Sequence, residues 1–168
     1  MLPGERGQIP TQVIFEWLRN GGSTEMAVDG SGTTQVFTYE FNSNGKDIKI
    51  LNVQLNISGA KLDDPEFFGG LPAALTNGIE LGFLKKDANG SQEEILGVFK
   101  NNYEMLAGSS SSKPWGFTKD ARDVMVVKFF EDYDICLPAF QYTGIYLKVK
   151  DDLTALHSMN MAIRGYST

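Results

Sequence analysis

The sequence predicts an all-β fold: a two-sheet antiparallel sandwich of the jelly-roll kind, with about eight to ten strands. Apolar and polar residues alternate over 51–57, over 145–150 and over 158–164, and a period of two is typical of a strand with one buried face. The 18 glycines and 11 phenylalanines indicate many tight turns between aromatic-rich strands. No long stretch carries a helical period, so two stacked sheets are the expected architecture.

The first predicted strand lies within 11–19 (TQVIFEWLR), where both faces are partly apolar and a short helix would also fit. We favour the strand because β-branched and aromatic residues dominate it, and because Asn20-Gly21-Gly22 ends it sharply. Residues 24–28 and 33–41 are predicted to form a hairpin around the turn sequence at 29–32.

The strand at 48–58 follows a turn at 42–46 and carries an unusual polar face. Its outward positions hold Asn52, Gln54 and Asn56, which are amides without any charge. A fully solvated surface normally carries charged residues, so this face is expected to meet a partner or another loop.

The next segment, 59–77, is long and irregular and contains the adjacent rings of Phe67 and Phe68. Two adjacent residues of an extended chain point in opposite directions. We therefore expect one ring to fill the core and the other to cap an end of the sandwich. Strands are predicted at 78–86 and 93–99, joined by a turn.

The longest break spans 101–118 and includes a Gly/Ser-rich stretch followed by Trp115. This tryptophan is expected to anchor the base of a loop or to contact a partner. Residues 123–130 form a nearly continuous apolar run, which predicts a central strand covered on both faces. The last two alternating runs flank Asp151-Asp152 and are interpreted as a pair of antiparallel strands that closes the sandwich.

Length and charge narrow the possible roles. The 168 residues suit an N-terminal arm at 1–10 and a single domain at 11–168. A net charge of -6 and the absence of any run of Lys and Arg argue against nucleic-acid binding. No apolar run approaches 18 residues and the first residues do not resemble a secretory signal, so neither a membrane span nor export is expected.

The side chains that carry chemistry are sparse. His157 and Cys136 are the only histidine and cysteine, which is too few for a zinc site and excludes an internal disulfide. The pairs Asp63-Asp64 and Asp151-Asp152, and Asp132 with Asp134, lack the spacing of a calcium loop and are interpreted as turn residues. Cys136 is expected to be a small buried apolar residue. We therefore expect no enzyme, no metal and no cofactor.

An alternative function comes from the aromatic residues. A β-sandwich with exposed, coplanar rings can bind sugars by stacking. The candidates for such a platform are Trp17, Trp115, Phe67, Phe68 and Tyr142. A lectin-like carbohydrate-binding module, with a surface glycan as its ligand, is therefore the second hypothesis.

Three stretches carry a resemblance to a known group of proteins. Residues 17–38 (WLRNGGSTEMAVDGSGTTQVFT), 68–80 (FGGLPAALTNGIE) and 149–166 are similar to segments of small structural proteins of tailed bacteriophages. The resemblance covers about a third of the chain. It implies a virion component, such as a capsid decoration (cement) protein or a neck or tail accessory, made in the host cytoplasm.

That resemblance implies partners of two kinds: copies of the chain itself and a major capsid or tail protein. The arm at 1–10 offers one route, because an arm can add a strand to an exposed sheet edge. The other residues expected to contact partners lie on the amide face and in the aromatic loops. They are Asn52, Gln54, Asn56, Phe67, Phe68 and Trp115.

Overall fold

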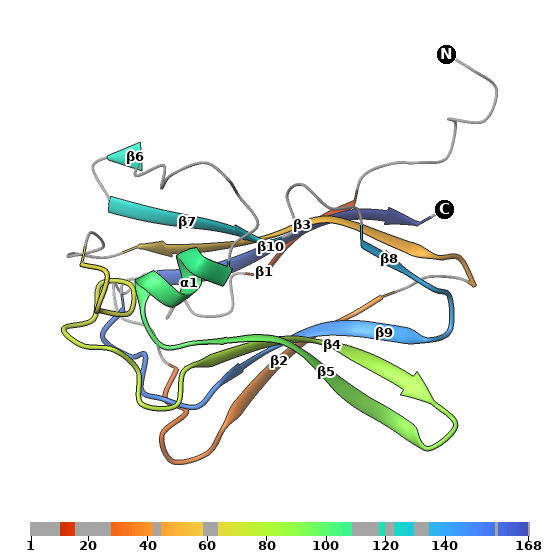
Figure 1. Ribbon diagram of the computed structural model, residues 1–168, viewed down its shortest axis with the longest axis horizontal. Helices are drawn as coiled ribbons and strands as arrows, with labels where there is room; N and C mark the ends of the chain where they lie inside the picture. Colours follow the sequence, from red (N-terminus) through yellow and green to blue (C-terminus); the bar gives the residue numbers. More distant parts are fainter. Residues whose placement is uncertain are drawn as a thin grey trace.

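The computed structural model describes residues 11–15, 28–41, 45–58, 64–108, 118–119, 123–129, 135–156 and 158–167. Within these residues the chain forms ten strands and one short helix, arranged as two antiparallel sheets stacked face to face (Figure 1). The predicted all-β sandwich is therefore confirmed. The strands are β1 (Thr11–Phe15), β2 (Gln35–Glu40), β3 (Ile48–Ser58), β4 (Ile79–Asp87), β5 (Gly90–Phe99), β6 (Thr118–Lys119), β7 (Asp123–Phe129), β8 (Ile135–Leu137), β9 (Tyr142–Val149) and β10 (Ser158–Ser167), and the helix is α1 (Asn102–Gly108).

The strand order is that of a jelly roll. One sheet has the order β1-β10-β3-β7-β6, and the other has the order β2-β9-β4-β5. β8 also pairs with β3, along the same edge as β7: β8 lies beside Ile48–Ile50, and β7 lies beside Val53–Ser58. When β7 and β8 are taken as two parts of one interrupted strand, and the two-residue β6 is set aside, each sheet has four strands, and the chain crosses to the other sheet after every strand except β4, which continues into β5 of the same sheet.

The pairing of the last two strands corrects the sequence interpretation. β9 pairs with β2 and β4 in one sheet, whereas β10 pairs with β1 and β3 in the other. The turn residues Asp151 and Asp152 thus lie in a connection between sheets and not in a hairpin. Each strand turns its apolar face to the core from its own side, so both arrangements give the same alternation in the sequence.

The predicted early hairpin has a related outcome. Residues 24–27 lie outside the described part of the chain, and β2 pairs along its described length with β9. In contrast, β4 and β5 form the hairpin expected around the turn at 87–90. A local turn sequence specified that hairpin, while β2 finds its partner more than a hundred residues further along the chain.

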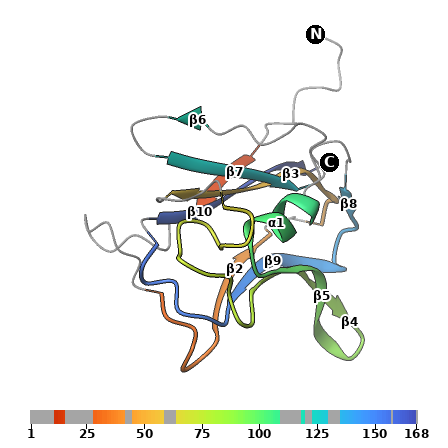
Figure 2. The ribbon, with the colours of Figure 1, turned by 60° about the vertical axis from the view of Figure 1, so that its left-hand side comes forward.

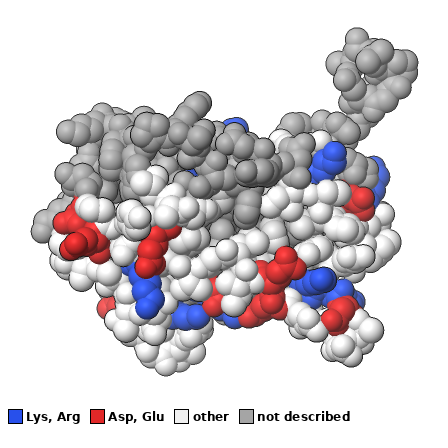
Figure 3. Space-filling view, in the orientation of Figure 1, with Lys and Arg blue, Asp and Glu red and all other residues white. Residues whose placement is uncertain are grey.

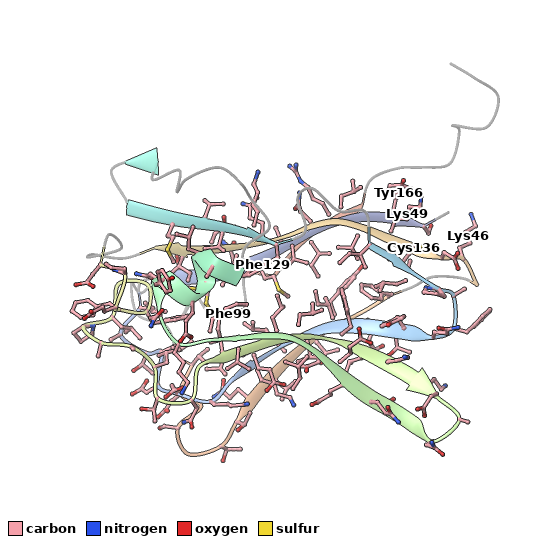
Figure 4. All side chains as sticks on the ribbon, viewed as in Figure 1. Lys46, Lys49, Phe99, Phe129, Cys136 and Tyr166 are labelled. Carbon is pink, nitrogen blue, oxygen red and sulfur yellow. The ribbon has the colours of Figure 1, made fainter. Side chains whose placement is uncertain are left out.

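The core lies between the two sheets and is made of the inward positions of both. Its fully buried members include Val53 and Ile57 from β3 and Ile145, Leu147 and Val149 from β9. Figure 4 shows Phe99 of β5 and Phe129 of β7 meeting across this layer, and their ring centroids are 5.2 Å apart. Burial of each such side chain contributes about 1.5–3 kcal/mol, so the alternating faces provide most of the stability of the sandwich.

The end of the sandwich that contains α1, which we call the helix end, is closed by α1 and the segment 64–78. α1 lies between the sheets in both views (Figures 1 and 2) and contacts β5 on one side and β7 on the other. It falls inside the predicted break at 101–118. The Asn101 side chain accepts a hydrogen bond from the Glu104 N–H at 2.8 Å, and Glu104 accepts one from the Lys100 N–H at 2.6 Å. This arrangement resembles a capping box, and the Asn-x-x-Glu spacing was a signal for it.

One carboxylate fastens the segment 64–78 to the end of β9. The Asp151 side chain accepts hydrogen bonds from the backbone N–H groups of Thr76 (2.9 Å), Asn77 (3.0 Å) and Gly78 (2.8 Å). Three successive N–H groups that converge on one charged acceptor form a strong local anchor. The predicted turn role of Asp151 is thus accompanied by a tertiary role that the sequence did not indicate.

Candidate functional site

The outer face of the β1-β10-β3-β7-β6 sheet carries the predicted amide row. Gln54 Nε2 donates a hydrogen bond to Asn56 Oδ1 at 2.7 Å, and Asn56 Nδ2 donates one to Asn160 Oδ1 of β10 at 2.6 Å. These side chains are partly buried and form a continuous chain of amides across two strands. Amides on this face therefore satisfy one another, and Asn160 is a member that the sequence analysis did not include.

Asn52 stands apart from that chain of amides. Its side chain is 9% exposed, and its Oδ1 has no hydrogen-bond partner among the residues that the structure describes. Its position on β3 is opposite Arg164 of β10, which is exposed. A buried acceptor without a donor costs about 1–3 kcal/mol, so Asn52 is the position on this face at which an additional donor would be favourable.

The outer face of the β2-β9-β4-β5 sheet carries a cluster of charged residues around Glu80. The Glu80 carboxylate accepts a hydrogen bond from Tyr146 Oη at 3.0 Å and from Lys150 Nζ at 2.7 Å, and it lies 3.5 Å from Lys148 Nζ. Lys148 also forms an ion pair with Glu93 of β5 and lies over the Tyr146 ring, 5.1 Å from its centroid. Figure 3 shows acidic and basic side chains interspersed over this lower sheet.

A glycine makes room for the buried tyrosine of this cluster. Tyr146 is 0% exposed, although it points to the outer face of the sheet. Its hydroxyl group lies where a Cβ atom at Gly82, directly opposite on β4, would stand. The ring therefore lies across β4 with its hydroxyl group on Glu80, and any larger residue at position 82 would displace it.

The environment shifts the pKa of three groups in opposite directions. Burial raises the pKa of Glu80. Hydrogen bonds from Lys150 and Tyr146 and the charges of Lys148 and Lys150 lower it by more than burial raises it, so the pKa of Glu80 is lowered overall. Burial, followed by the hydrogen bond to Glu80, raises the pKa of Tyr146. The hydrogen bond to Glu93 raises the pKa of Lys148. The cluster thus holds a carboxylate, a phenol and an ammonium group in their usual neutral-pH forms.

The opposite end of the sandwich, which we call the turn end, contains the turns at 87–90 and 138–141 and exposes one aromatic ring. Phe140 is 76% exposed and has φ of 65°, the only non-glycine residue with positive φ in the described part of the chain. It is the third residue of a turn closed by the Gln141 N–H and the Pro138 carbonyl at 3.2 Å. This position normally selects glycine or asparagine.

Two contacts fix that turn to the rest of the fold. The Ala139 N–H donates to Asp47 Oδ1 at 2.8 Å, and the Lys86 N–H donates to the Gln141 carbonyl at 2.6 Å. The Phe140 ring itself lies beside Gly45, where an added Cβ would be 3.1 Å from the ring. The turn is thus tied to both sheets, which holds an unfavourable backbone conformation and an exposed apolar side chain in place.

We expect Phe140→Gly to raise the free energy of unfolding by about 0.5–1 kcal/mol. The left-handed conformation costs a side-chain-bearing residue about 1–2 kcal/mol, and the extra entropy of glycine in the unfolded chain cancels part of this gain. Urea unfolding followed by circular dichroism measures the change. Phe140→Ala removes the ring but keeps the strain, so it should show no such gain; equal stability of the Gly and Ala variants would contradict the role of φ.

The structure places the remaining sequence candidates as follows. Phe68 is 0% exposed and packs in the core, which corrects its expected role as a partner contact, while Phe67 beside it is half-buried. Cys136, expected to be buried, is exposed on β8. Trp115 and His157 lie outside the described residues. The core position of Phe68 confirms that one of the two adjacent rings fills the core. Cys136 is exposed because it alternates along β8 with Leu137, which is buried.

The aromatic residues of the described part do not gather into one platform. Apart from Phe140 at the turn end, Tyr103 is the exposed ring, and it lies on α1 at the helix end. Tyr142 is half-buried, packs edge-to-face on Phe83 at 5.9 Å, and donates its hydroxyl hydrogen to Glu94. Tyr103 and Phe140 are thus separated by the length of the strands, and stacking of one sugar on both is excluded.

Two further properties concern the described residues only. They contain no cluster of three or more His, Cys, Asp or Glu residues that could bind a metal ion. Their single helix is too short and too polar to span a bilayer.

Comparisons with known proteins add no assignment. No family model matches the chain, and neither a curated protein nor a solved structure matches it significantly.

Proposed function

We propose that the chain is a non-enzymatic structural component of a tailed-phage virion, either a capsid decoration (cement) protein or a neck or tail accessory. In this role it binds copies of itself and a major capsid or tail protein. The resemblance of residues 17–38, 68–80 and 149–166 to phage structural proteins supports the class. The jelly-roll strand order agrees with it, because this architecture is common among viral capsid proteins, although a fold by itself does not define a function.

The observation that carries the proposal is the exposed Phe140 in its strained turn. Exposure of an aromatic ring and a left-handed backbone both reduce the stability of the isolated molecule. Aromatic residues that fill a pocket on a partner dominate the energy of many protein interfaces. The Phe140 side chain can form apolar contacts but cannot transfer a proton, so this position suits an assembly contact better than a catalytic role.

The test compares incorporation into particles. Phage particles are isolated on a density gradient from a lysate of the strain that carries the gene, and the chain in them is quantified by mass spectrometry. The wild-type chain should be present, and Phe140→Gly should reduce its amount at least tenfold, which corresponds to about 1.4 kcal/mol of lost contact energy.

The matched control is Tyr103→Ala, because Tyr103 is also an exposed ring but lies at the helix end. This variant should be incorporated like the wild type. If the wild-type chain is absent from purified particles, the virion assignment is wrong; if Phe140→Gly is incorporated normally, the contact assigned to Phe140 is wrong.

A further inference from the structure

The edge of the β2-β9-β4-β5 sheet formed by β5 contains an apolar stretch that lacks charged residues and proline. β5 is ten residues long and, within the described part of the chain, pairs with a strand on one side only, β4. Natural edge strands commonly carry outward charges or proline that prevent pairing with another chain. Residues 95–99 (ILGVF) contain neither.

The acidic residues nearest to that stretch are directed back over their own sheet. The Glu93 carboxylate forms an ion pair with Lys148 of β9, and Glu94 Oε2 accepts a hydrogen bond from Tyr142 Oη of β9 at 2.9 Å. Both partners lie beyond β4, on the side away from the free edge. Both carboxylates of β5 are therefore already paired within their own sheet, and neither is an unpaired charge on the edge.

A bulge places two apolar side chains together on the outer face of this edge. Ile95 lies opposite Gly82 and Val98 lies opposite Glu80, with a register shift that inserts Leu96 into β5. Leu96 packs toward the core, so Ile95 and Val98 share the outer face although they are three residues apart. They are 56% and 40% exposed, respectively.

We propose that β5 pairs antiparallel with β5 of a second copy, around a two-fold axis between Leu96 and Gly97. In this register Ile95 is opposite Val98 of the other copy, and Glu93 is opposite Lys100 of the other copy. Apolar residues thus meet apolar residues and opposite charges meet, twice each by symmetry. The extra residue of the bulge, Leu96, lies next to the two-fold axis in both copies. The two bulges are therefore adjacent, and the register between the two β5 strands is the same on either side of the axis.

The result is a continuous sheet that runs through two molecules and ends in β2 on each side. The inference deepens the proposed function, because it assigns the surface by which copies of the chain bind one another. One strand edge and a few side chains bury less than a standard interface of about 1,600 Å². We therefore expect a dimer with a micromolar Kd that forms reversibly with concentration.

The first test is the molar mass of the purified chain by sedimentation equilibrium over about 10–500 micromolar, a range that brackets such a Kd. The wild type should approach twice its 18.5 kDa monomer mass, and Ile95→Lys should remain at the monomer mass. The matched control is Val36→Lys, because Val36 is 50% exposed on the same outer face but lies on β2 at the other edge. This control should dimerise like the wild type.

The second test probes the register. Lys100→Glu places two carboxylates opposite each other and should raise Kd at least tenfold, and adding Glu93→Lys to it should restore the wild-type value. A role of these residues within one molecule would not produce that rescue. A monomeric wild type, a dimeric Ile95→Lys or a failed rescue would each overturn the β5 pairing.

These outcomes are separable from the proposed function. A wild-type chain that is monomeric but enters phage particles overturns the β5 pairing and leaves the virion role intact. A chain that dimerises through β5 but is absent from particles supports the pairing and overturns the virion role.

Discussion

Replacing Asn102 by alanine should lower the free energy of unfolding by about 3 kcal/mol, the largest loss expected from any single polar side chain of the helix end. Asn102 is 0% exposed. Its Oδ1 accepts a hydrogen bond from the Gly69 N–H at 2.7 Å, and its Nδ2 donates to the carbonyl groups of Asp64 and Gly69 at 2.8 and 3.3 Å. The alanine variant would leave buried backbone groups without partners.

The effect should extend beyond the hydrogen bonds themselves. Gly69 has φ of 53°, and its Cα lies against Ile57 and Leu156 so closely that a Cβ would clash with the Ile57 side chain. Asn102 therefore fixes the backbone at Gly69, directly after Phe68, and so helps to keep the Phe68 ring in the core. Loss of the amide should loosen this segment, which amide hydrogen exchange of residues 67–71 would detect.

The control for this prediction is the adjacent residue. Asn101→Ala removes a partly buried cap of α1, because the Asn101 side chain accepts the hydrogen bond from the Glu104 N–H, and this change should cost about 1 kcal/mol. Chemical unfolding of the two variants should therefore separate them by about 2 kcal/mol. Equal losses would mean that the buried amide contributes no more than an ordinary helix cap.

Replacing Glu80 by alanine should lower the free energy of unfolding by about 2–4 kcal/mol. The carboxylate is 6% exposed and is the common acceptor of Tyr146, Lys148 and Lys150. Without it, the fully buried Tyr146 hydroxyl group has lost its acceptor, Lys150 has lost the carboxylate that it is paired with, and Lys148 is left with Glu93. Partial exposure of the lysines places the expected loss below that of a fully buried pair.

Two variants calibrate this prediction. Glu80→Gln keeps an acceptor for Tyr146 and should lose less than the alanine variant. Glu94→Ala removes another carboxylate that accepts a tyrosine hydrogen bond, but Glu94 is exposed, so its loss should stay within about 0.5 kcal/mol. Thermal and urea unfolding measure all three, and a Glu94→Ala loss as large as that of Glu80→Ala would contradict the role of burial.

The same cluster predicts how stability depends on pH. The pKa of Glu80 is lowered in the folded protein, so its contribution is fully present above the pKa of an unfolded glutamate, about 4.3, and is lost as the pH falls through the folded value. The pKa values of Tyr146 and Lys148 are raised, so their contributions are fully present below the unfolded values, about 10, and are lost at higher pH. Glu80→Gln should flatten the acid side of the stability profile.

The sequence could indicate the strands of this protein with good accuracy, because period-two alternation has a direct physical cause. Apolar and polar residues must alternate along a strand that has one face on the core. The strands β3, β4, β9 and β10 could therefore be predicted from the sequence without knowing which strands they pair with. The β4–β5 hairpin could also be predicted, because Asn89-Gly90 is a typical turn sequence, and Gly90 has φ of 116° in the structure. α1 was missed because a seven-residue helix carries too few turns for a periodic signal.

The candidate surfaces were less accessible to sequence reasoning. The amide row on β3 was visible as a pattern, but its continuation to Asn160 required the pairing of β3 with β10, about a hundred residues apart. Glu80, Tyr146 and Lys148 each occupy an outward position, yet nothing local shows that β4 lies beside β9. Phe140 gave no signal, because its turn uses phenylalanine where glycine or asparagine would announce it.

What the sequence determined alone is therefore which segments are strands and which face of each strand is buried, since both follow from local stereochemistry and the cost of exposing apolar surface. Only the tertiary structure decided which strands are neighbours. A one-dimensional alternation is the same for every partner, so it cannot tell that β9 and β10 separate into two sheets or that β5 is left at an edge. The surfaces proposed to bind other molecules arise from that choice of neighbours.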